Sequence, residues 1–292
     1  MSDSELTRRL SPPPRSLPVA LSIRVVLGGF GQIGWLLLGF GLIFVWAFGA
    51  DRAVVTAFRL AGGLEVVEGT TTGWRELNLT INDVTVYETS YAFSVEGRSF
   101  SGASYETGYY APEGQRLPVE YRPSNPEASR LQGMRASPTG LVAAFVLIIP
   151  LIGLIVLRAG LRRGFRARRL LAEGVLAHGT LVADEVTNAQ VNEQSVHRMT
   201  FEFTAANGGS YQVVTSTHAI GRLLDDAREA IVYDPRHPAD ATTLDDLPGR
   251  PTIDERGELR SGGAGQAVVA FMNLLVPAAT IFGHGAFLLL YR

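Results

Sequence analysis

Polar residues inside apolar stretches are the first candidates for chemistry in this chain, because a polar group is expensive to place in hydrocarbon. Four residues at spacings of four, three and four lie in the charge-free stretch 261–291: Asn273, Pro277, Thr280 and His284. On a helix this spacing puts them within about 60° of one another, as one polar stripe. In another charge-free stretch, Gln32 lies among glycines that allow a neighbouring helix to approach closely. We expect Gln32, Asn273, Thr280 and His284 to hold helices together; transport, or proton sensing through His284, is the alternative.

Histidines recur at intervals of roughly 20 residues in the second half of the chain: His178, His197, His218 and His237. Metal sites usually show closer ligand pairs, and only His218 with Asp225 comes near that pattern. The chain has no cysteine, no G-x-S-x-G nucleophile motif, and no lysine for a phosphate-binding G-x-x-x-x-G-K-[ST] loop. The sequence therefore predicts no metal, no cofactor and no enzyme activity.

All 26 basic residues are arginines, and one short segment concentrates six of them without any acid. These are Arg158, Arg162, Arg163, Arg166, Arg168 and Arg169. On a helix, four of them lie within about 80° beside an apolar face, so a basic amphipathic helix is expected over 158–172. Anionic lipid headgroups are its expected partner, at about 1 kcal/mol per arginine near the surface. Nucleic acid is not expected, because the domain that follows is acidic and lacks an aromatic platform.

Three long apolar segments must position these residues. Each has the roughly 20 residues that a helix needs to cross about 30 Å of hydrocarbon, which predicts transmembrane helices over 25–50, 136–158 and 265–290. A signal peptide is the alternative for the first segment, since arginines precede it and the small residues of "AFGA" end it. Its apolar run exceeds the usual length of about 7–15 residues, which favours a retained anchor.

The segments on either side of the second predicted helix repeat one pattern, which defines β-domain copies over 62–132 and 174–246. "EGTTTG" at 68–73 aligns with "HGTLVA" at 178–183, and "YAFSVEGRSFSG" at 91–102 aligns with "FEFTAANGGSYQV" at 201–213. Each copy ends on a Y-x-P-x-x-P motif: Tyr121, Pro123 and Pro126, then Tyr233, Pro235 and Pro238. Alternation of period two predicts about five short strands per copy, and the prolines end a strand at a fixed turn. So few strands are expected to curl into a small barrel or sandwich.

These residues resemble a bacterial family of membrane-anchored modules catalogued as domain of unknown function 3592. The resemblance rests on an early G-T strand, an "F-x-F-T…G…Y" hairpin and the closing V-x-Y-x-P-x-x-P phrase. Copy one departs from it with Arg122 where copy two has Asp234, and with a longer insertion, "WRELNLTINDVTVYETS", before its hairpin. The resemblance implies a small β-rich domain beside transmembrane helices, and it brings no catalytic residues.

The sequence thus predicts a mixed membrane protein, with three transmembrane helices and two small all-β repeat domains. Residues 1–24 are expected to be a disordered cytoplasmic terminus, and residues 247–264 a polar linker. Arginines near the helix ends place the N-terminus and copy two inside, and copy one outside, a bacterial cytoplasmic membrane. The expected function is a non-enzymatic assembly or accessory subunit with a protein partner or self-association. A sensor or transport component that responds to an outer ligand or proton is the alternative.

Overall fold

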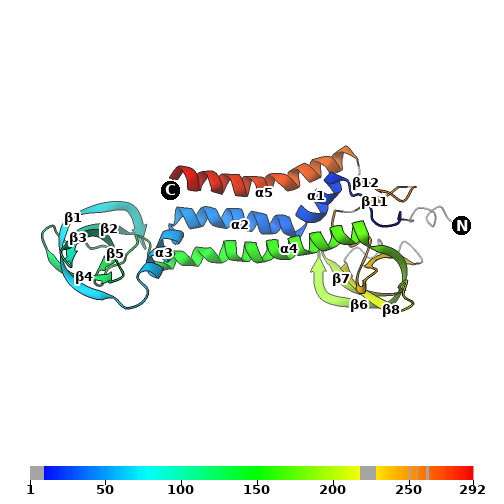
Figure 1. Ribbon diagram of the computed structural model, residues 1–292, viewed down its shortest axis with the longest axis horizontal. Coiled ribbons are helices and arrows are strands. Elements are labelled where there is room, and N and C mark those ends of the chain that lie inside the picture. Colours follow the sequence, from blue (N-terminus) through cyan, green and yellow to red (C-terminus); the bar gives the residue numbers. More distant parts are fainter. Residues whose placement is uncertain (1–9, 218–227, 250, 255, 261–262, 292) are drawn as a thin grey trace. The chain divides into compact units, whose positions relative to one another are not determined.

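The computed structural model describes residues 10–217, 228–249, 251–254, 256–260 and 263–291 (Figure 1). The chain divides into two compact units, which are described separately. Unit 1 comprises Met1–Leu37 and Ile152–Arg292, and unit 2 comprises Leu38–Leu151. Within the described residues the fold is mixed: five α-helices accompany two five-stranded β-sheets.

Three helices are long and apolar enough to cross a membrane, judged by length and composition in the described part of the chain. They are α2 (Phe30–Ala47), α4 (Ile148–Glu173), which a 3₁₀ turn at Leu141–Leu147 precedes, and α5 (Ala264–Tyr291). The predicted helix over 25–50 is wrong at its start, because Gly28 is extended and Gly29 has φ of +58°. That break separates α1 (Val19–Leu27) from α2, and a short helix α3 (Ala50–Arg59) follows α2.

Glycines bring α4 close to α1 and α2 within unit 1. A Cβ atom added at Gly34 would lie 2.5 Å from the Leu157 Cα atom, and one added at Gly160 would lie 2.5 Å from the Gly31 nitrogen. No side chain fits at such distances, so these glycines are required for the backbone contact.

The first sheet lies in unit 2 and has the strand order β3-β2-β1-β4-β5, with every pair antiparallel (Figure 1). Its strands are β1 (Glu65–Ile81), β2 (Val84–Val95), β3 (Arg98–Thr107), β4 (Arg116–Arg122) and β5 (Asn125–Leu131). Tyr105 on β3 exchanges two backbone hydrogen bonds, of 2.8 and 3.0 Å, with Arg135 beyond β5. The sheet is therefore nearly closed into a barrel, and its interior is filled by Tyr91, Phe93, Val119, Tyr121 and Leu131.

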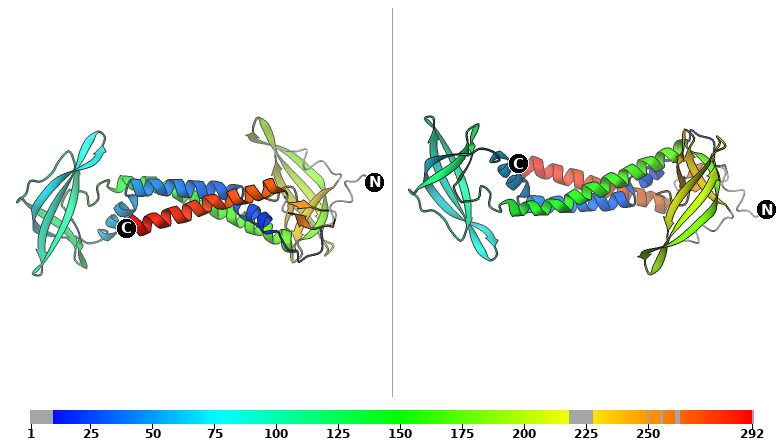
Figure 2. Two further views of the ribbon diagram at one scale, coloured as in Figure 1. Left: turned by 90° about the horizontal axis from the view of Figure 1, so that it is seen from above. Right: turned by 90° about the horizontal axis from the view of Figure 1, so that it is seen from below.

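The second sheet lies in unit 1 and repeats this topology in the order β8-β7-β6-β9-β10. Its strands are β6 (Val175–Val191), β7 (Gln194–Thr204), β8 (Ser210–Thr217), β9 (Glu229–Asp234) and β10 (His237–Thr243). The strands of each sheet curve strongly (Figure 2). The interior of the second sheet is filled by residues such as Met199, Phe201, Phe203, Ile231 and Tyr233.

The repeat extends to irregular details of the backbone. The first strand is bulged between Thr71 and Gly73 in one copy and between Leu181 and Ala183 in the other. The hairpin tips Asn82-Asp83 and Asn192-Glu193 both have positive φ at both positions. The expected longer insertion in copy one is wrong, because β1 and β6 both have 17 residues. These first strands are also long, where short strands were expected.

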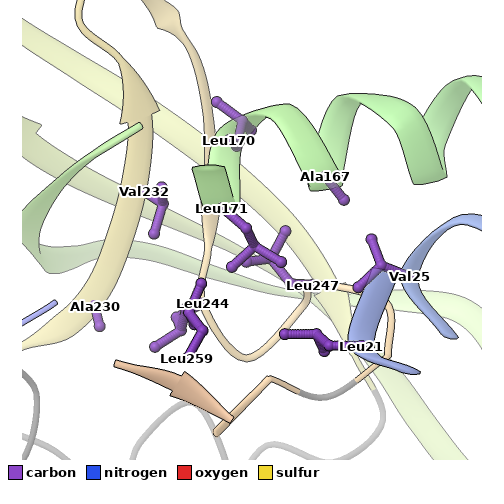
Figure 3. Close-up of a cluster of buried hydrophobic side chains, with 10 residues drawn as sticks. All are labelled: Leu21, Val25, Ala167, Leu170, Leu171, Ala230, Val232, Leu244, Leu247 and Leu259. Carbon is purple, nitrogen blue, oxygen red and sulfur yellow. The ribbon is translucent and has the colours of Figure 1, made fainter. Parts of the chain in front are cut away.

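A second hydrophobic core in unit 1 covers the outer face of β9 (Figure 3). Leu21 and Val25 of α1 point toward Leu171 and Leu247, and Val232 lies on the β9 side of the same cluster. The predicted linker over 247–264 instead forms a small hairpin, β11 (Thr252–Ile253) with β12 (Leu259–Arg260), and Leu259 is buried in this core.

The N-terminal segment from residue 10 onward packs on other parts of unit 1, where the sequence predicts disorder over 1–24. Ser11 donates its N–H to the Gly257 carbonyl at 2.8 Å, and Arg15 donates to the Leu171 carbonyl at 2.9 Å. Arg24 is buried and donates to the Gln266 side chain at 2.6 Å and to the Gly249 carbonyl. A local sequence pattern cannot predict these hydrogen bonds, because the two partners of each are more than 150 residues apart along the chain.

Candidate functional site

The arginines at the end of α4 divide into two groups by their contacts. Arg163 pairs with Asp246 at 3.0 Å, and Arg166 pairs with Asp240 at 2.5 Å. Arg169 contacts Asp240 as well, and lies 3.6 Å from Asp234. Arg158, Arg162 and Arg168 are exposed and pair with no acid among the residues that the structure describes. Three of the six arginines predicted to contact lipid headgroups therefore hold the second β-domain, and three face outward.

A cleft of about 450 Å³ lies beside this arginine group, between α4, β8 and the chain that follows β10. Arg163, Arg166, Thr215, Ser216, Thr242 and Asp246 supply its polar lining. Its apolar lining includes Ala167, Leu170 and Leu247 of the core shown in Figure 3. Its volume lies in the range typical of small-ligand sites. The repeated sequence pattern does not predict this cleft, because its residues come from three separate segments.

The structure brings together two of the four predicted intramembrane polar residues. The Gln32 amide donates to the Asn273 carbonyl of α5 at 2.8 Å and to the Leu27 carbonyl at 2.6 Å. The contact uses the backbone of Asn273, while the side chain of Asn273 lies against Gly28. Thr280 and His284 lie about two and three turns beyond Asn273, on the same partly buried face of α5.

The two Y-x-P-x-x-P motifs form equivalent hairpins. Pro123 and Pro235 begin two-residue turns, and Pro126 and Pro238 lie in the return strands β5 and β10. The tyrosines point inward with satisfied hydroxyls: Tyr121 donates to Glu65 at 2.8 Å, and Tyr233 accepts the Ala206 N–H at 2.9 Å. The motif therefore fixes a turn and fills each interior.

The histidines do not gather into a metal site within the described residues, where no group of three potential ligands occurs. His197 contacts Asp184 at 2.7 Å, and His237 lies 3.9 Å from Asp234. His178 pairs with Ala230 in the ladder between β6 and β9. His218 and Asp225, the pair closest to a ligand pattern, lie outside the described residues.

An aromatic cluster on the first β-domain was missed by the sequence reasoning. Trp74 stacks on Tyr110 with ring centroids 3.8 Å apart, and Tyr87 lies 5.4 Å from Tyr110. Trp74 remains 46% exposed. On the opposite face of these strands, Arg75 makes a two-pronged contact with Glu88 at 2.7 and 2.8 Å. Exposed Trp and Tyr side chains are enriched at protein interfaces.

Two tyrosines of the first β-domain are held in the neutral form. Burial raises the pKa of Tyr91, whose hydroxyl lies 3.0 Å from the Ser129 hydroxyl. Burial, together with the neighbouring Glu88 carboxylate, raises the pKa of Tyr105 to about 12. These phenols act as structural hydrogen-bonding groups, since neither ionises near neutral pH.

Comparison with protein-family models, with curated proteins and with solved structures gives no match for this chain.

Proposed function

We propose that the chain is an integral protein of the bacterial cytoplasmic membrane that acts as a non-enzymatic assembly or accessory subunit. In this proposal α2, α4 and α5 span the bilayer and the two β-domains bind partner proteins. The resemblance to the family of membrane-anchored modules supports this class of protein. The observation that carries the proposal is the pairing of three exposed apolar helices with two β-domains of identical topology.

The surfaces of the three helices support membrane insertion. Only about a fifth of each apolar window is buried (22%, 17% and 17%), so large side chains such as Phe40, Ile155 and Phe282 are exposed. Exposed apolar surface of this extent requires hydrocarbon or another protein to cover it. α3 adds to this: it begins three residues after α2 ends, and its Val55 and Phe58 are 47% and 79% exposed. An amphipathic helix at that place suits the headgroup interface.

The number of spans supports display on both membrane faces. Only α4 separates the first β-domain from the second along the chain, and a single span changes sides. The six arginines after the apolar part of α4 favour a cytoplasmic location for the second β-domain. The first β-domain and its Trp74 cluster would then face outward.

The interiors of both sheets support a binding role over catalysis. Among the described residues, Tyr, Phe, Met and aliphatic side chains pack together in both interiors. Binding would instead use the outer surfaces, and the Trp74 cluster has the composition of an interface centre.

The test is purification of the full chain after mild detergent extraction. We expect a partner to co-purify in fixed ratio, and Trp74→Ala to lower its recovery because the stacked ring is lost. Val84→Ala is the matched control, since Val84 is an equally exposed apolar residue on β2. The proposal fails if the chain purifies alone and responds to pH in a way that His284→Ala abolishes, which would favour the sensor.

A further inference from the structure

The two β-domains differ at the seam where the last strand approaches the third. In the first domain the Leu131 N–H of β5 donates to the Ser104 hydroxyl of β3 at 2.8 Å. Strand register gives the equivalents in the second domain. Ser104 pairs with Thr89 and Thr215 pairs with Met199, so Thr215 is the equivalent of Ser104. Leu131 pairs with Val119 and Thr243 pairs with Ile231, so Thr243 is the equivalent of Leu131.

The hydroxyl groups of Thr215 and Thr243 make no hydrogen bond with the described residues. Thr215 is 4% exposed and Thr243 is fully buried, and the Oγ1 atom of each lacks a partner. A buried hydroxyl without a partner costs roughly 1–3 kcal/mol, so such groups are rare in folded proteins and usually meet water or a ligand. Thr215 lines the 450 Å³ cleft, and Thr243 follows Thr242, which also lines it.

The charged lining of this cleft favours an anion. Arg163 and Arg166 line it, and Asp246 is the one acid among the described residues of its lining. Asp246 and Asp240 each hold one edge of a guanidinium, and the Ala241 carbonyl accepts from Arg166 at 3.0 Å. These contacts orient the two arginines and leave other N–H groups of each fork unused by any described residue. Guanidinium forks with hydroxyl donors are the groups that bind phosphate oxygens in proteins.

We infer that this cleft binds a phosphate group, through Arg163, Arg166 and the Thr215 hydroxyl. The phosphate comes either from a free phosphate compound or from a lipid headgroup. Arg163 lies five residues beyond Arg158, about 7.5 Å along α4, which is the depth of headgroups if α4 spans the bilayer. The lipid source therefore rests on the membrane placement proposed above, and the free phosphate source does not.

The test uses the purified full chain in a neutral detergent. Isothermal titration with inorganic phosphate measures the free source, and native mass spectrometry with added phosphatidylglycerol or phosphatidylcholine measures the lipid source. We expect Arg163→Gln to weaken binding about tenfold and Thr215→Val about fivefold, as loss of a charged and a neutral hydrogen bond implies. Arg162→Gln is the matched control, because Arg162 is a neighbouring exposed arginine outside the cleft.

Each outcome decides the inference. Binding of inorganic phosphate supports a free ligand, whereas selective retention of phosphatidylglycerol alone supports a headgroup, provided that both cleft variants weaken it. Thr215→Val is nearly isosteric and removes an unpaired hydroxyl, so its unliganded thermal stability should equal or exceed that of the parent. The inference is overturned if neither inorganic phosphate nor phosphatidylglycerol binds. It is also overturned if Arg162→Gln weakens binding as much as Arg163→Gln does and Thr215→Val has no effect. None of these results depends on a partner protein.

Discussion

Arg122 and Asp234 occupy the same position of the repeated motif and make different contacts. Arg122 donates to the Arg59 carbonyl at the end of α3, at 3.2 Å. Asp234 accepts the Arg236 N–H at 2.9 Å, which closes its turn, and lies 3.6 Å from Arg169 of α4. Both contacts lie at the C-terminal end of a helix, but Arg122 uses a backbone carbonyl and Asp234 an arginine side chain.

Gln32 offers a test of the contact between α2 and α5. Gln32→Met removes hydrogen bonds to two backbone carbonyls while keeping side-chain length, so we expect stability in detergent to fall by about 1 kcal/mol. Unfolding in a denaturing detergent measures the change. Thr280→Val serves as control, because the Thr280 hydroxyl has no partner in the described part of the chain. Equal effects of the two changes would contradict the role of Gln32.

Tyr105 makes the first β-domain sensitive to alkali. Its folded pKa of about 12 exceeds the usual value near 10, so the folded state disfavours the phenolate. This contribution to stability is complete below about pH 10 and is lost as pH rises toward 12. We expect ultraviolet titration of the full chain to show a late phenol that Tyr105→Phe removes. An unchanged alkaline end of the titration curve would contradict this.

At the scale of elements, β9 and β4 show how the copies diverge. The inward residues match, with Ile231 and Tyr233 equivalent to Val119 and Tyr121. Their outward neighbours differ: Val232 is buried against α4, whereas Glu120 is partly exposed and pairs with Arg130 at 2.7 Å. The signal was present in the sequence, because a continuous apolar run predicts a strand covered on both faces and alternation predicts one covered face.

The tips of the long hairpins provide a matched pair of stability tests. Asp83 and Glu193 have φ of 63° and 64°, a conformation that costs most residues about 1 kcal/mol and glycine almost nothing. We expect Glu193→Gly to stabilise more than Asp83→Gly, because aspartate tolerates this conformation better than glutamate does. Hydrogen exchange of the flanking strands measures both changes. Glu193→Ala is the control, since it keeps the strain; stabilisation by alanine equal to that by glycine would contradict the explanation.

Much of the architecture could be predicted from local patterns, and long-range packing could not. Alternation around Tyr91 and Phe201 predicts the strands, and long apolar runs predict three long helices. The break at Gly28 and Gly29 was hidden inside an apolar run. The burial of Leu259 depends on partners in α1 and α4 that no local pattern identifies. The cleft was missed for the same reason, since Arg163 and Thr215 are 52 residues apart.

For the whole molecule, the proposed membrane topology can be tested cleanly because the chain has no cysteine. Ser101→Cys in the first β-domain and Gln194→Cys in the second introduce exposed single thiols. We expect a membrane-impermeant maleimide to label position 101 in intact spheroplasts and position 194 only after lysis. Labelling of both positions from the same side would contradict an odd number of spans between the two domains.

The core around Leu21 and Leu259 joins residues from almost opposite ends of the chain. A nascent polypeptide leaves the ribosome from its N-terminus, so α1 emerges long before β12 is synthesised. Its first partners in this core lie on α4, which is synthesised only after the whole first β-domain. We therefore expect α1 to be accessible to protease when the ribosome stalls before Ala167, and to become protected once the chain through Leu259 has been made.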